Sequence, residues 1–488
     1  MSDDNSKNSL LLFQLGPVQS FIAQAETLGD LAVGSSILSE VTAAAIKSFD
    51  GWQDALVFPS PKDNPELKGI PNRFLMFVPK GQGEEIAEAC EEAARGALST
   101  LATETHKIFN RNHPGKLDNP IPFLQQVNQF LQITWAVLEE PTGDMGNDMG
   151  KDYKAIGKLM AMRRNTREFD AWLEEGYGQK KDFLSGKEVA LLNGRGAMNL
   201  IKQFRAEQEA DQFEIPESLK PSKDKKGVYL AVIAMDGDQM GKTLSGFKNI
   251  DDHRKFSEQL GAFANSVKED IPKDGLLIYA GGDDVLAVVK ADVAIDVANK
   301  LQNKFKTKVG NNASAGIAIG HSSVPLQDLV HAAHAAESRA KKTYGRNALA
   351  ISIYKRSGEI LEWGCKWESK ALDLYGELSN LSVLNNAEQI NIGRFPYKLA
   401  ALLQPYALKG EVDEQMQAIV MAEYDHAVEQ TKDMRDEHKQ ERLTRDYVAA
   451  YLKACCKDTE EVSAKPEDFL NLFMVETFIN RPHEGEDD

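Results

Sequence analysis

Short apolar runs alternate with longer segments of helical periodicity in the first third of the chain. Runs of this kind are typical of buried strands, and they occur at 10–16, 72–79 and 130–140. Between them, residues 17–49 and 84–109 repeat apolar positions at the spacing of one helix face. This alternation predicts a compact α/β sandwich, in which helices cover a sheet, over residues 10–140.

The same alternation returns, more legibly, at residues 223–357. The apolar run at 228–236 predicts a buried strand, and two β-rich runs joined by Gly-Gly-Asp-Asp predict a hairpin. The order is strand, helix, two hairpin strands, helix and strand, followed by one more helix and strand. This is the order of a ferredoxin-like sandwich, so we predict an α+β protein with two similar domains.

Turn-rich and polar stretches divide the rest of the chain. They bound a helical insertion that we place at 141–222. From 358 to 488 the pattern is mostly helical, with charges on one side, which is typical of a solvated helical bundle. Residues 1–9 are polar and acidic and predict a disordered tail.

The amino-acid composition and net charge argue against some classes of function. Among 488 residues, 57 are basic and 74 acidic, which gives a net charge of −17. This argues against a chain that grips nucleic acid unaided, although a local basic groove or RNA held by partner subunits remains compatible. The four cysteines form no Cys-x-x-Cys pair. Neither a signal peptide nor an apolar run of about 18 residues occurs, so we expect a cytoplasmic protein without membrane contact.

The strongest chemical signal pairs AMDGDQMG at 234–241 with AGGDDVL at 280–286. Asp236 falls at the end of a buried strand, while Asp283 and Asp284 fall on a hairpin tip expected to lie beside it, facing solvent. Carboxylates that converge from rigid elements are what Mg²⁺ or Mn²⁺ needs in phosphoryl transfer. Alone, GGDD would equally fit a hairpin turn with solvated acids, but the combination favours a metal-dependent site.

Glycines around these carboxylates predict a nucleotide site. Gly281 and Gly282 keep the turn free of side chains, so that the backbone can approach a phosphate or base. After Asp236, the segment GDQMGK opens a loop or helix whose free N–H groups would cradle a triphosphate. The residues nominated there are Gly237, Asp238 and Gly241.

The segment AKKTYGRNALAI at 340–351 offers a phosphate-binding lysine. Lys342, two residues and Gly-Arg-Asn match a pattern of GGDEF-type nucleotide cyclases, and a lysine there neutralises β- and γ-phosphates. A lysine at the negative end of a helix dipole explains the same position. Both interpretations are open for Lys342, whereas we favour the helix-end explanation for Lys341.

Several other side chains have a structural explanation beside a functional one. His331 and His334 are three apart and suit one metal, but histidines of a core or groove are more common. Trp363 and Trp367 are expected on a helix, packed against the preceding domain rather than stacking on bases. Ser35 either contacts a nucleotide in the first domain or lies at a small-residue contact within a helix.

YLAVIAMDGDQMGKTLSG together with YAGGDDVLAVV resembles the large palm-domain subunit of type III-B CRISPR–Cas (Cmr) effector complexes. Further segments similar to that family lie at 16–39, 69–79, 160–169, 351–359 and 472–481. The resemblance therefore covers nearly the whole chain.

The resemblance implies two palm domains, a helical insertion between them and a helical C-terminal domain. It also implies that ATP is converted into cyclic oligoadenylate, or a related adenylated messenger, when target RNA binds. The partners implied are other Cmr-type subunits, guide RNA and target RNA. By position, Asp236, Asp283 and Asp284 become the metal-binding carboxylates.

The sequence departs from that family in three places. No His-Asp dipeptide occurs, so we predict no HD nuclease domain. The insertion reads GKEVALLNG at 186–194 where the family usually has Cys-x-x-Cys, so we predict that it holds no zinc. Glu26 and Gly29 stand where the first-palm signature usually has arginines, and Ala32 stands where it has tryptophan.

Two other functions compete with this one. A GGDEF-like cyclase would make a cyclic dinucleotide from GTP, but Val285 stands where those proteins place phenylalanine. A non-catalytic scaffold would only hold partner subunits, but all three carboxylates are present. Analysis of the nucleotide product separates these functions.

Overall fold

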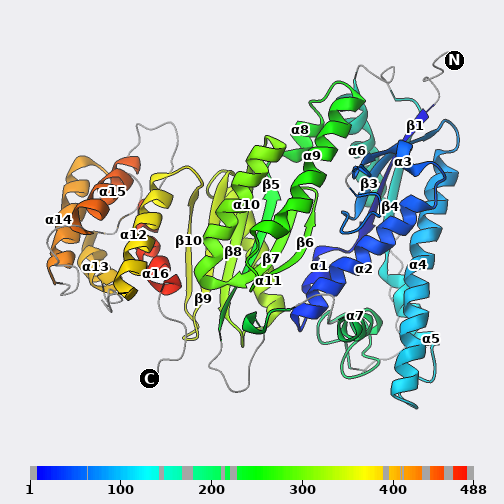
Figure 1. Cartoon of the computed structure of the whole chain (residues 1–488), viewed down its shortest axis with the longest axis horizontal. Helices are drawn as coiled ribbons and strands as arrows, with labels where there is room; N and C mark the ends of the chain where they lie inside the picture. The colour runs from blue at the N-terminus through cyan, green and yellow to red at the C-terminus, as the bar shows by residue number, and fades with distance from the viewer. Residues whose placement is uncertain are drawn as a thin grey trace.

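The computed structural model describes residues 8–62, 64–141, 148–166, 180–209, 215–219, 228–387, 395–406, 408, 412–430, 440–455 and 465–480. Two sheets and a terminal group of helices follow one another along the long axis of the molecule (Figure 1). The first strand begins at Asn8, so the predicted tail is wrong at residues 8–9. Residues 1–7 lie outside the described part of the chain.

The first sheet has the strand order β2-β3-β1-β4. Its strands are β1 (Asn8–Gly16), β2 (Leu56–Phe58), β3 (Arg73–Pro79) and β4 (Gln132–Leu138). Its helices are α1 (Gln19–Ala23), α2 (Leu28–Lys47), α3 (Trp52–Ala55), α4 (Gly83–Asn112) and α5 (Ile121–Phe130). The order is that of a ferredoxin-like sandwich. We did not predict β2, because three residues are too few to show a periodicity.

The second sheet has the order β10-β9-β8-β5-β7-β6. Its strands are β5 (Tyr229–Gly237), β6 (Leu276–Gly281), β7 (Asp284–Lys290), β8 (Ala313–His321), β9 (Ala348–Tyr354) and β10 (Ile360–Lys366). Its helices are α8 (Met240–Leu244), α9 (Ile250–Ser266), α10 (Ala294–Val309) and α11 (Leu326–Lys342). The four strands β8-β5-β7-β6 form the predicted ferredoxin-like sandwich, and β9 extends it parallel to β8.

Alternate residues of β5 belong to two different cores. Leu230, Val232 and Ala234 pack in a core that also contains side chains of the first sheet and its helices. Ile233 and Met235 pack in a second core, which continues into the C-terminal helices. Since both faces of β5 are covered, the strand is apolar throughout instead of alternating with polar residues. The two domains therefore share one packed interior.

The predicted helix around Trp363 and Trp367 is wrong. Residues 360–366 form strand β10, which pairs antiparallel with β9 and so extends the second sheet past the predicted domain boundary at 357. The expectation that both indoles pack is confirmed. Trp363 stacks on Tyr375 at 5.6 Å between ring centroids, and Trp367 Nε1 donates to the Ala313 carbonyl at 2.9 Å.

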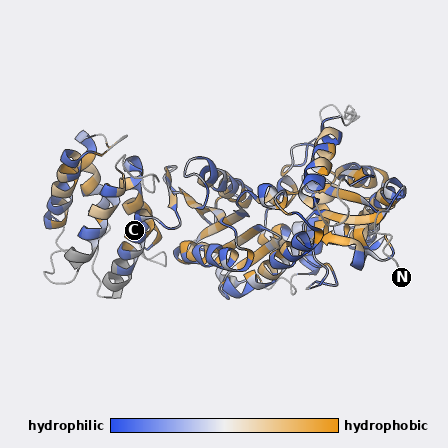
Figure 2. Cartoon of the chain, turned by 90° about the horizontal axis from the view of Figure 1, so that it is seen from above, coloured by the Kyte–Doolittle hydropathy of each residue, from blue (hydrophilic) through white to orange (hydrophobic). Residues whose placement is uncertain are grey.

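Helices make up the insertion and the C-terminal part. They are α6 (Met149–Asn165), α7 (Ala197–Gln208), α12 (Lys370–Ala387), α13 (Phe395–Leu403), α14 (Glu414–Gln430), α15 (Gln440–Ala454) and α16 (Phe469–Ile479). Figure 2 shows apolar strands enclosed between helices whose outer faces are hydrophilic. Among the described residues, every helix is too short or too polar to cross a bilayer.

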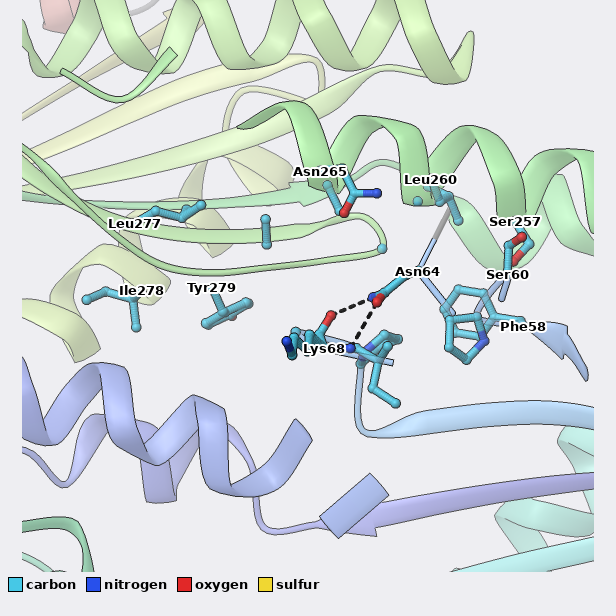
Figure 3. A pocket seen from close by; sticks show the side chains of 18 residues that line it. Phe58, Ser60, Asn64, Lys68, Ser257, Leu260, Asn265, Leu277, Ile278 and Tyr279 are labelled. Atoms are coloured by element: carbon cyan, nitrogen blue, oxygen red, sulfur yellow. Dashed lines mark hydrogen bonds between the residues drawn. The ribbon is translucent and has the colours of Figure 1, made fainter. Parts of the chain in front are cut away.

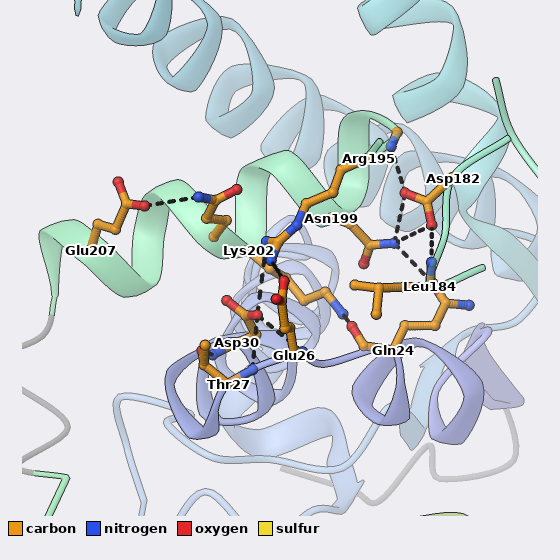
Figure 4. A network of polar contacts seen from close by, with 12 residues as sticks. Gln24, Glu26, Thr27, Asp30, Asp182, Leu184, Arg195, Asn199, Lys202 and Glu207 are labelled. Atoms are coloured by element: carbon orange, nitrogen blue, oxygen red, sulfur yellow. Dashed lines mark hydrogen bonds and ion pairs between the residues drawn. The ribbon is translucent and has the colours of Figure 1, made fainter. Parts of the chain in front are cut away.

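Asp182 organises the loop of the insertion that precedes α7. Its carboxylate accepts hydrogen bonds from the backbone N–H groups of Leu184 at 2.9 Å and Ser185 at 2.6 Å, and from Asn199 Nδ2 at 3.0 Å (Figure 4). Burial opposes ionisation of Asp182, but hydrogen bonds from backbone N–H groups outweigh it and lower its pKa. The Asp182 carboxylate thus holds the loop of the insertion, where the chain lacks the Cys-x-x-Cys of the family.

A buried lysine joins α7 to the first domain. Lys202 is fully buried, and its Nζ donates to the Phe21 carbonyl at 2.8 Å. Burial lowers the pKa of Lys202 to about 7, although the charges of Asp30 and Asp182 oppose the shift. The position of α7 therefore depends on a polar contact that the hydropathy pattern does not reveal.

Candidate active site

The predicted carboxylates come together at one end of the second sheet. β5 pairs antiparallel with β7, and Met235 lies opposite Val285. Asp236, the next residue of β5, therefore reaches the edge where the β6–β7 hairpin turns back. A Cβ atom added at Gly237 would lie 2.9 Å from the Cβ of Asp283. Glycine is needed there because any side chain would collide with the turn.

The GGDD segment forms the predicted hairpin turn. Gly281 pairs with Asp284, which leaves Gly282 and Asp283 as the two central residues. Gly282 has a φ of 69°, which the first central position of a type II′ turn requires. The turn thus fixes the directions of two neighbouring carboxylates on a rigid hairpin.

The hairpin tip lies against the first domain. A Cβ atom added at Gly282 would stand 3.5 Å from the ring of Phe58, and one at Gly281 would stand 3.7 Å from the backbone of Pro71. Phe58 ends β2, and Pro71 lies in the chain between β2 and β3. The site is therefore built by the two domains together.

Both hairpin carboxylates are half-buried, so the expectation that they face solvent is wrong. Burial raises the pKa of Asp283 to about 7, and the negative charge of Asp236 adds to the shift. Burial also raises the pKa of Asp284 well above its ordinary value, and a side-chain hydrogen bond with Asp236 contributes. Carboxylates this close cannot all ionise without a compensating cation.

Lys341, not Lys342, enters this cluster. The Lys341 ammonium contacts the carboxylate of Asp236 and lies 2.6 Å from that of Glu337. Our preference for a helix-end role of Lys341 is therefore wrong, because the last turn of α11 points its side chain at the carboxylates. Lys342 is exposed, and its contact with phosphate stays a prediction.

The residue set fits a divalent ion. Three carboxylates offer the oxygen donors that Mg²⁺ and Mn²⁺ prefer, and their raised pKa values reveal negative charge that lacks a cation. As the side chains stand, Lys341 contacts Asp236, and within the described ranges no three His, Cys, Asp or Glu side chains are grouped as a ready metal site. An ion bound at these carboxylates would compete with Lys341 for Asp236.

Asp238 has a structural role that argues against nucleotide contact. It is 8% exposed, and its carboxylate accepts hydrogen bonds from Ser314 Oγ at 2.8 Å and from the backbone N–H of Asn347 at 2.8 Å. Asn347 itself has a φ of 46°, a strained conformation that this bond supports. Asp238 thus fastens the Gly-Arg-Asn turn to the end of β5.

The remaining nominated residues are dispersed. Gly241 lies in the five-residue helix α8 with open space around it. Ser35 is half-buried in the middle of α2. His331 is exposed, whereas His334 Nδ1 lies 3.7 Å from Glu337. The two histidines form part of no metal cluster among the described residues.

A cavity of about 260 Å³ adjoins the hairpin (Figure 3). Its walls come from the chain between β2 and β3, from α9 and from β6, and Gly282 lies at its edge. Ser257 of α9 lines it and is 3% exposed, and its Oγ has no hydrogen-bond partner among the described residues. We had not predicted these walls. Gly69 and Pro71 line the cavity just before the strand predicted at 72–79, in the segment 69–79 that only the family resemblance indicated.

Two family models match the chain. Residues 229–350 match the Cas10/Cmr2 second palm domain, and residues 10–103 match the N-terminal domain of the CRISPR-associated protein Cmr2. The first of these segments contains β5 to β8 and the start of β9, and the second contains most of β1 together with β2 and β3.

Two curated relatives are similar over part of their length. The chain is 35% identical over 174 residues to the CRISPR system Cmr subunit Cmr2 of Pyrococcus furiosus, covering 29% of this chain and 20% of that protein. It is 26% identical over 262 residues to the single-strand-specific deoxyribonuclease Cas10/Csm1 (subtype III-A) of Streptococcus thermophilus, covering 50% of this chain and 33% of that protein. The matches thus span about a fifth and a third of these relatives.

Solved structures share the fold. A type III-B Cmr-beta structure in the apo state aligns with a TM-score of 0.69 at 10% identity, covering 98% of this chain and 82% of that chain. The Cmr-beta structure bound to cognate target RNA aligns with a TM-score of 0.65 at 10% identity, covering 97% and 83%. The chain therefore carries a segment that matches the Cas10/Cmr2 second palm domain and one that matches the Cmr2 N-terminal domain, and it is a homologue of Cmr2 over part of its length.

Proposed function

We propose that this chain is the nucleotidyl cyclase subunit of a cytoplasmic, RNA-guided type III CRISPR effector complex. Its substrate is ATP, its product is cyclic oligoadenylate or a related adenylated messenger, and pyrophosphate leaves. Its partners are other Cmr-type subunits, guide RNA and target RNA. The observation that carries the proposal is the convergence of Asp236, Asp283 and Asp284 beside a cavity between two domains.

The three aspartates are the residues that would hold Mg²⁺ or Mn²⁺. Such an ion, when bound, supplies Lewis-acid stabilisation of the attacking hydroxyl and the α-phosphate. Asp283 and Asp284 release the protons that their raised pKa values retain. Asp236 turns away from Lys341, which leaves this ammonium free to neutralise charge that develops on a phosphate.

The cavity beside the hairpin is the proposed site of a nucleobase. Its walls are mostly apolar, and the buried Ser257 hydroxyl is a group that can both donate and accept. Adenine presents an amino donor and a ring-nitrogen acceptor on one edge, so one hydroxyl satisfies either. Gly282 at the cavity edge keeps the path from base to carboxylates free of side chains.

Product analysis tests the proposal. The purified chain, and then the assembled complex with target RNA, are incubated with labelled ATP and Mn²⁺, and the products are identified by mass spectrometry. We expect cyclic oligoadenylate, formed faster with target RNA. A cyclic dinucleotide formed from GTP would support a GGDEF-like cyclase instead, and a complex that leaves both nucleotides unchanged would contradict catalysis.

A further inference from the structure

Helix α6 presents a basic face on an acidic protein. Its exposed ionised side chains are all positive, at Lys151, Lys154, Lys158, Arg163 and Arg164. Asp152, the acidic residue within the helix, is only 4% exposed. The chain as a whole has a net charge of −17, so the net charge of the α6 side chains is opposite in sign to that of the chain.

Most of these cations are not neutralised by neighbours. Lys151 pairs with Asp148, but Lys154, Lys158 and Arg164 form no ion pair with any described residue. Arg163 lies over the ring of Trp135 at 3.7 Å. On a helix face that only keeps a protein soluble, acidic side chains are usually interspersed with the basic ones.

Apolar side chains are exposed among the cations. Leu159 is 38% and Met162 is 63% exposed, and they lie three residues apart on one face of α6. The opposite face is anchored, because Ile156 and Met160 are buried against the outer side of the first sheet. α6 is therefore well packed on its buried side, and loose packing of the helix does not explain why Leu159 and Met162 are exposed.

The helix also reaches the active-site domain. The Met149 N–H donates to the Lys248 carbonyl at 3.0 Å, and a Cβ atom added at Gly150 would lie 2.4 Å from the Ser245 carbonyl oxygen. On its other side α6 contacts the first sheet, because Arg73 of β3 lies over the ring of Tyr153 at 5.9 Å. In Figure 1, α6 accordingly lies beside α8, near the first sheet.

We propose that the exposed face of α6 is a docking surface for single-stranded RNA. Lys154 and Lys158 are one helical turn apart on the same side of α6, and Arg164 lies about 9 Å farther along the axis, at a rise of about 1.5 Å per residue. The cations are therefore spread along the helix, where a phosphate backbone can contact more than one of them. Arginine forks match phosphate oxygens, and the adjacent apolar side chains can cover a base or sugar. The choice of RNA over an acidic protein rests on the proposed function.

Charge reversal on the full chain tests the surface. The triple variant K154E/K158E/R164E is compared with K107E/R111E/K116E, which makes the same charge change at exposed positions in the last turns of α4 and just after it. Binding of a labelled, mixed-sequence 30-nucleotide RNA is measured by fluorescence anisotropy from 50 to 200 mM salt. We expect the α6 variant to bind at least tenfold more weakly. Each lost phosphate contact removes about 0.7 from the salt slope, so the slope should fall by about 2.

The outcomes are distinct. The control variant should bind within twofold of the parent chain, and thermal unfolding should show that both variants are folded. Equal losses in both variants would overturn the proposal, because they would reflect net charge alone. Unchanged RNA binding with loss of RNase-resistant association with effector subunits would mean that α6 binds an acidic protein. RNA binding is measured without ATP, so a negative result for the α6 surface can be distinguished from a negative result for the proposed cyclase activity.

Discussion

The ammonium of Lys341 contacts the carboxylate of Asp236 across 105 positions of sequence. α11 and β5 are adjacent in the second sheet's sandwich, so the last helical turn delivers a cation to the end of a strand. Lys341 lowers the pKa of Asp283, although burial and Asp236 raise it more. One lysine thus partly offsets the charge of three carboxylates.

Replacing both hairpin carboxylates should end product formation without unfolding the protein. D283A/D284A removes two half-buried groups that repel each other and Asp236. We expect turnover to fall by at least about 100-fold, the scale of a lost electrostatic stabiliser, while the melting temperature stays equal or rises. The control is D251A/D252A, an exposed pair of adjacent acids at the start of α9. Unchanged ATP turnover in D283A/D284A would refute the catalytic assignment.

K341M should move the acid limb of the pH–activity profile to higher pH. Loss of the ammonium removes a charge that lowers the pKa of Asp283, so this carboxyl group ionises only at higher pH. We also expect kcat/KM to fall about tenfold, or about 1.4 kcal/mol of barrier. The profile of kcat/KM reports groups of the free enzyme. K341R, which keeps the charge, should leave the acid limb close to its position in the parent, and an unshifted limb in K341M would contradict the role.

Stability should rise with pH above about 7 because of Lys202. Its pKa is lowered by burial from 10.5 to about 7. Between these values the unfolded chain binds a proton that the folded chain does not, so the free energy of unfolding increases with pH. Lowering the pH from 10.5 to about 7 removes this gain progressively, and below about pH 7 both states hold the proton, so Lys202 adds no further pH dependence. Urea unfolding at pH 7 and pH 9 should show a smaller increase in K202M than in the parent, and no such difference in K255M, at an exposed position of α9.

S257A should weaken ATP binding and leave the fold intact. The Ser257 hydroxyl has no hydrogen-bond partner among the described residues, so its removal costs little stability. If this hydroxyl binds the base, the KM for ATP should rise several-fold with little change in kcat. S266A, which removes a hydroxyl bonded to the Phe263 carbonyl of the same helix, should leave KM unchanged. Equal KM values in S257A and the parent would reject the base site.

Removal of divalent ions should not unfold the insertion. The Asp182 carboxylate already satisfies several N–H groups of the loop before α7. EDTA should therefore leave the melting temperature of the full chain unchanged, and elemental analysis should find no stoichiometric zinc. D182A leaves buried donors unsatisfied and should cost about 1–3 kcal/mol. A chain that loses its cooperative transition in EDTA would show that a metal, not Asp182, holds this loop.

Local patterns of apolar, polar and glycine positions predicted most of the strands and helices. β5 reads as a buried strand because both of its faces are covered, which requires an unbroken apolar run. The hairpin was predictable because Gly282 supplies the positive φ that a two-residue turn needs. β10 was misread as helix, since the spacing of Trp363 and Trp367 fits one helix face while only the first of them lies in the strand.

The sequence by itself therefore determined most of the order of strands and helices, apart from β2 and β10, together with the hairpin and the identity of the three aspartates, because each depends on neighbours in the chain. Tertiary structure alone decided that Lys341 rather than Lys342 faces Asp236, that Asp238 is turned inward to Ser314, and that Phe58 and Pro71 approach the hairpin. Those outcomes depend on helix rotation and on the packing of two domains. Contacts between residues far apart in the chain produce no periodic pattern of apolar and polar positions, so the sequence does not reveal them.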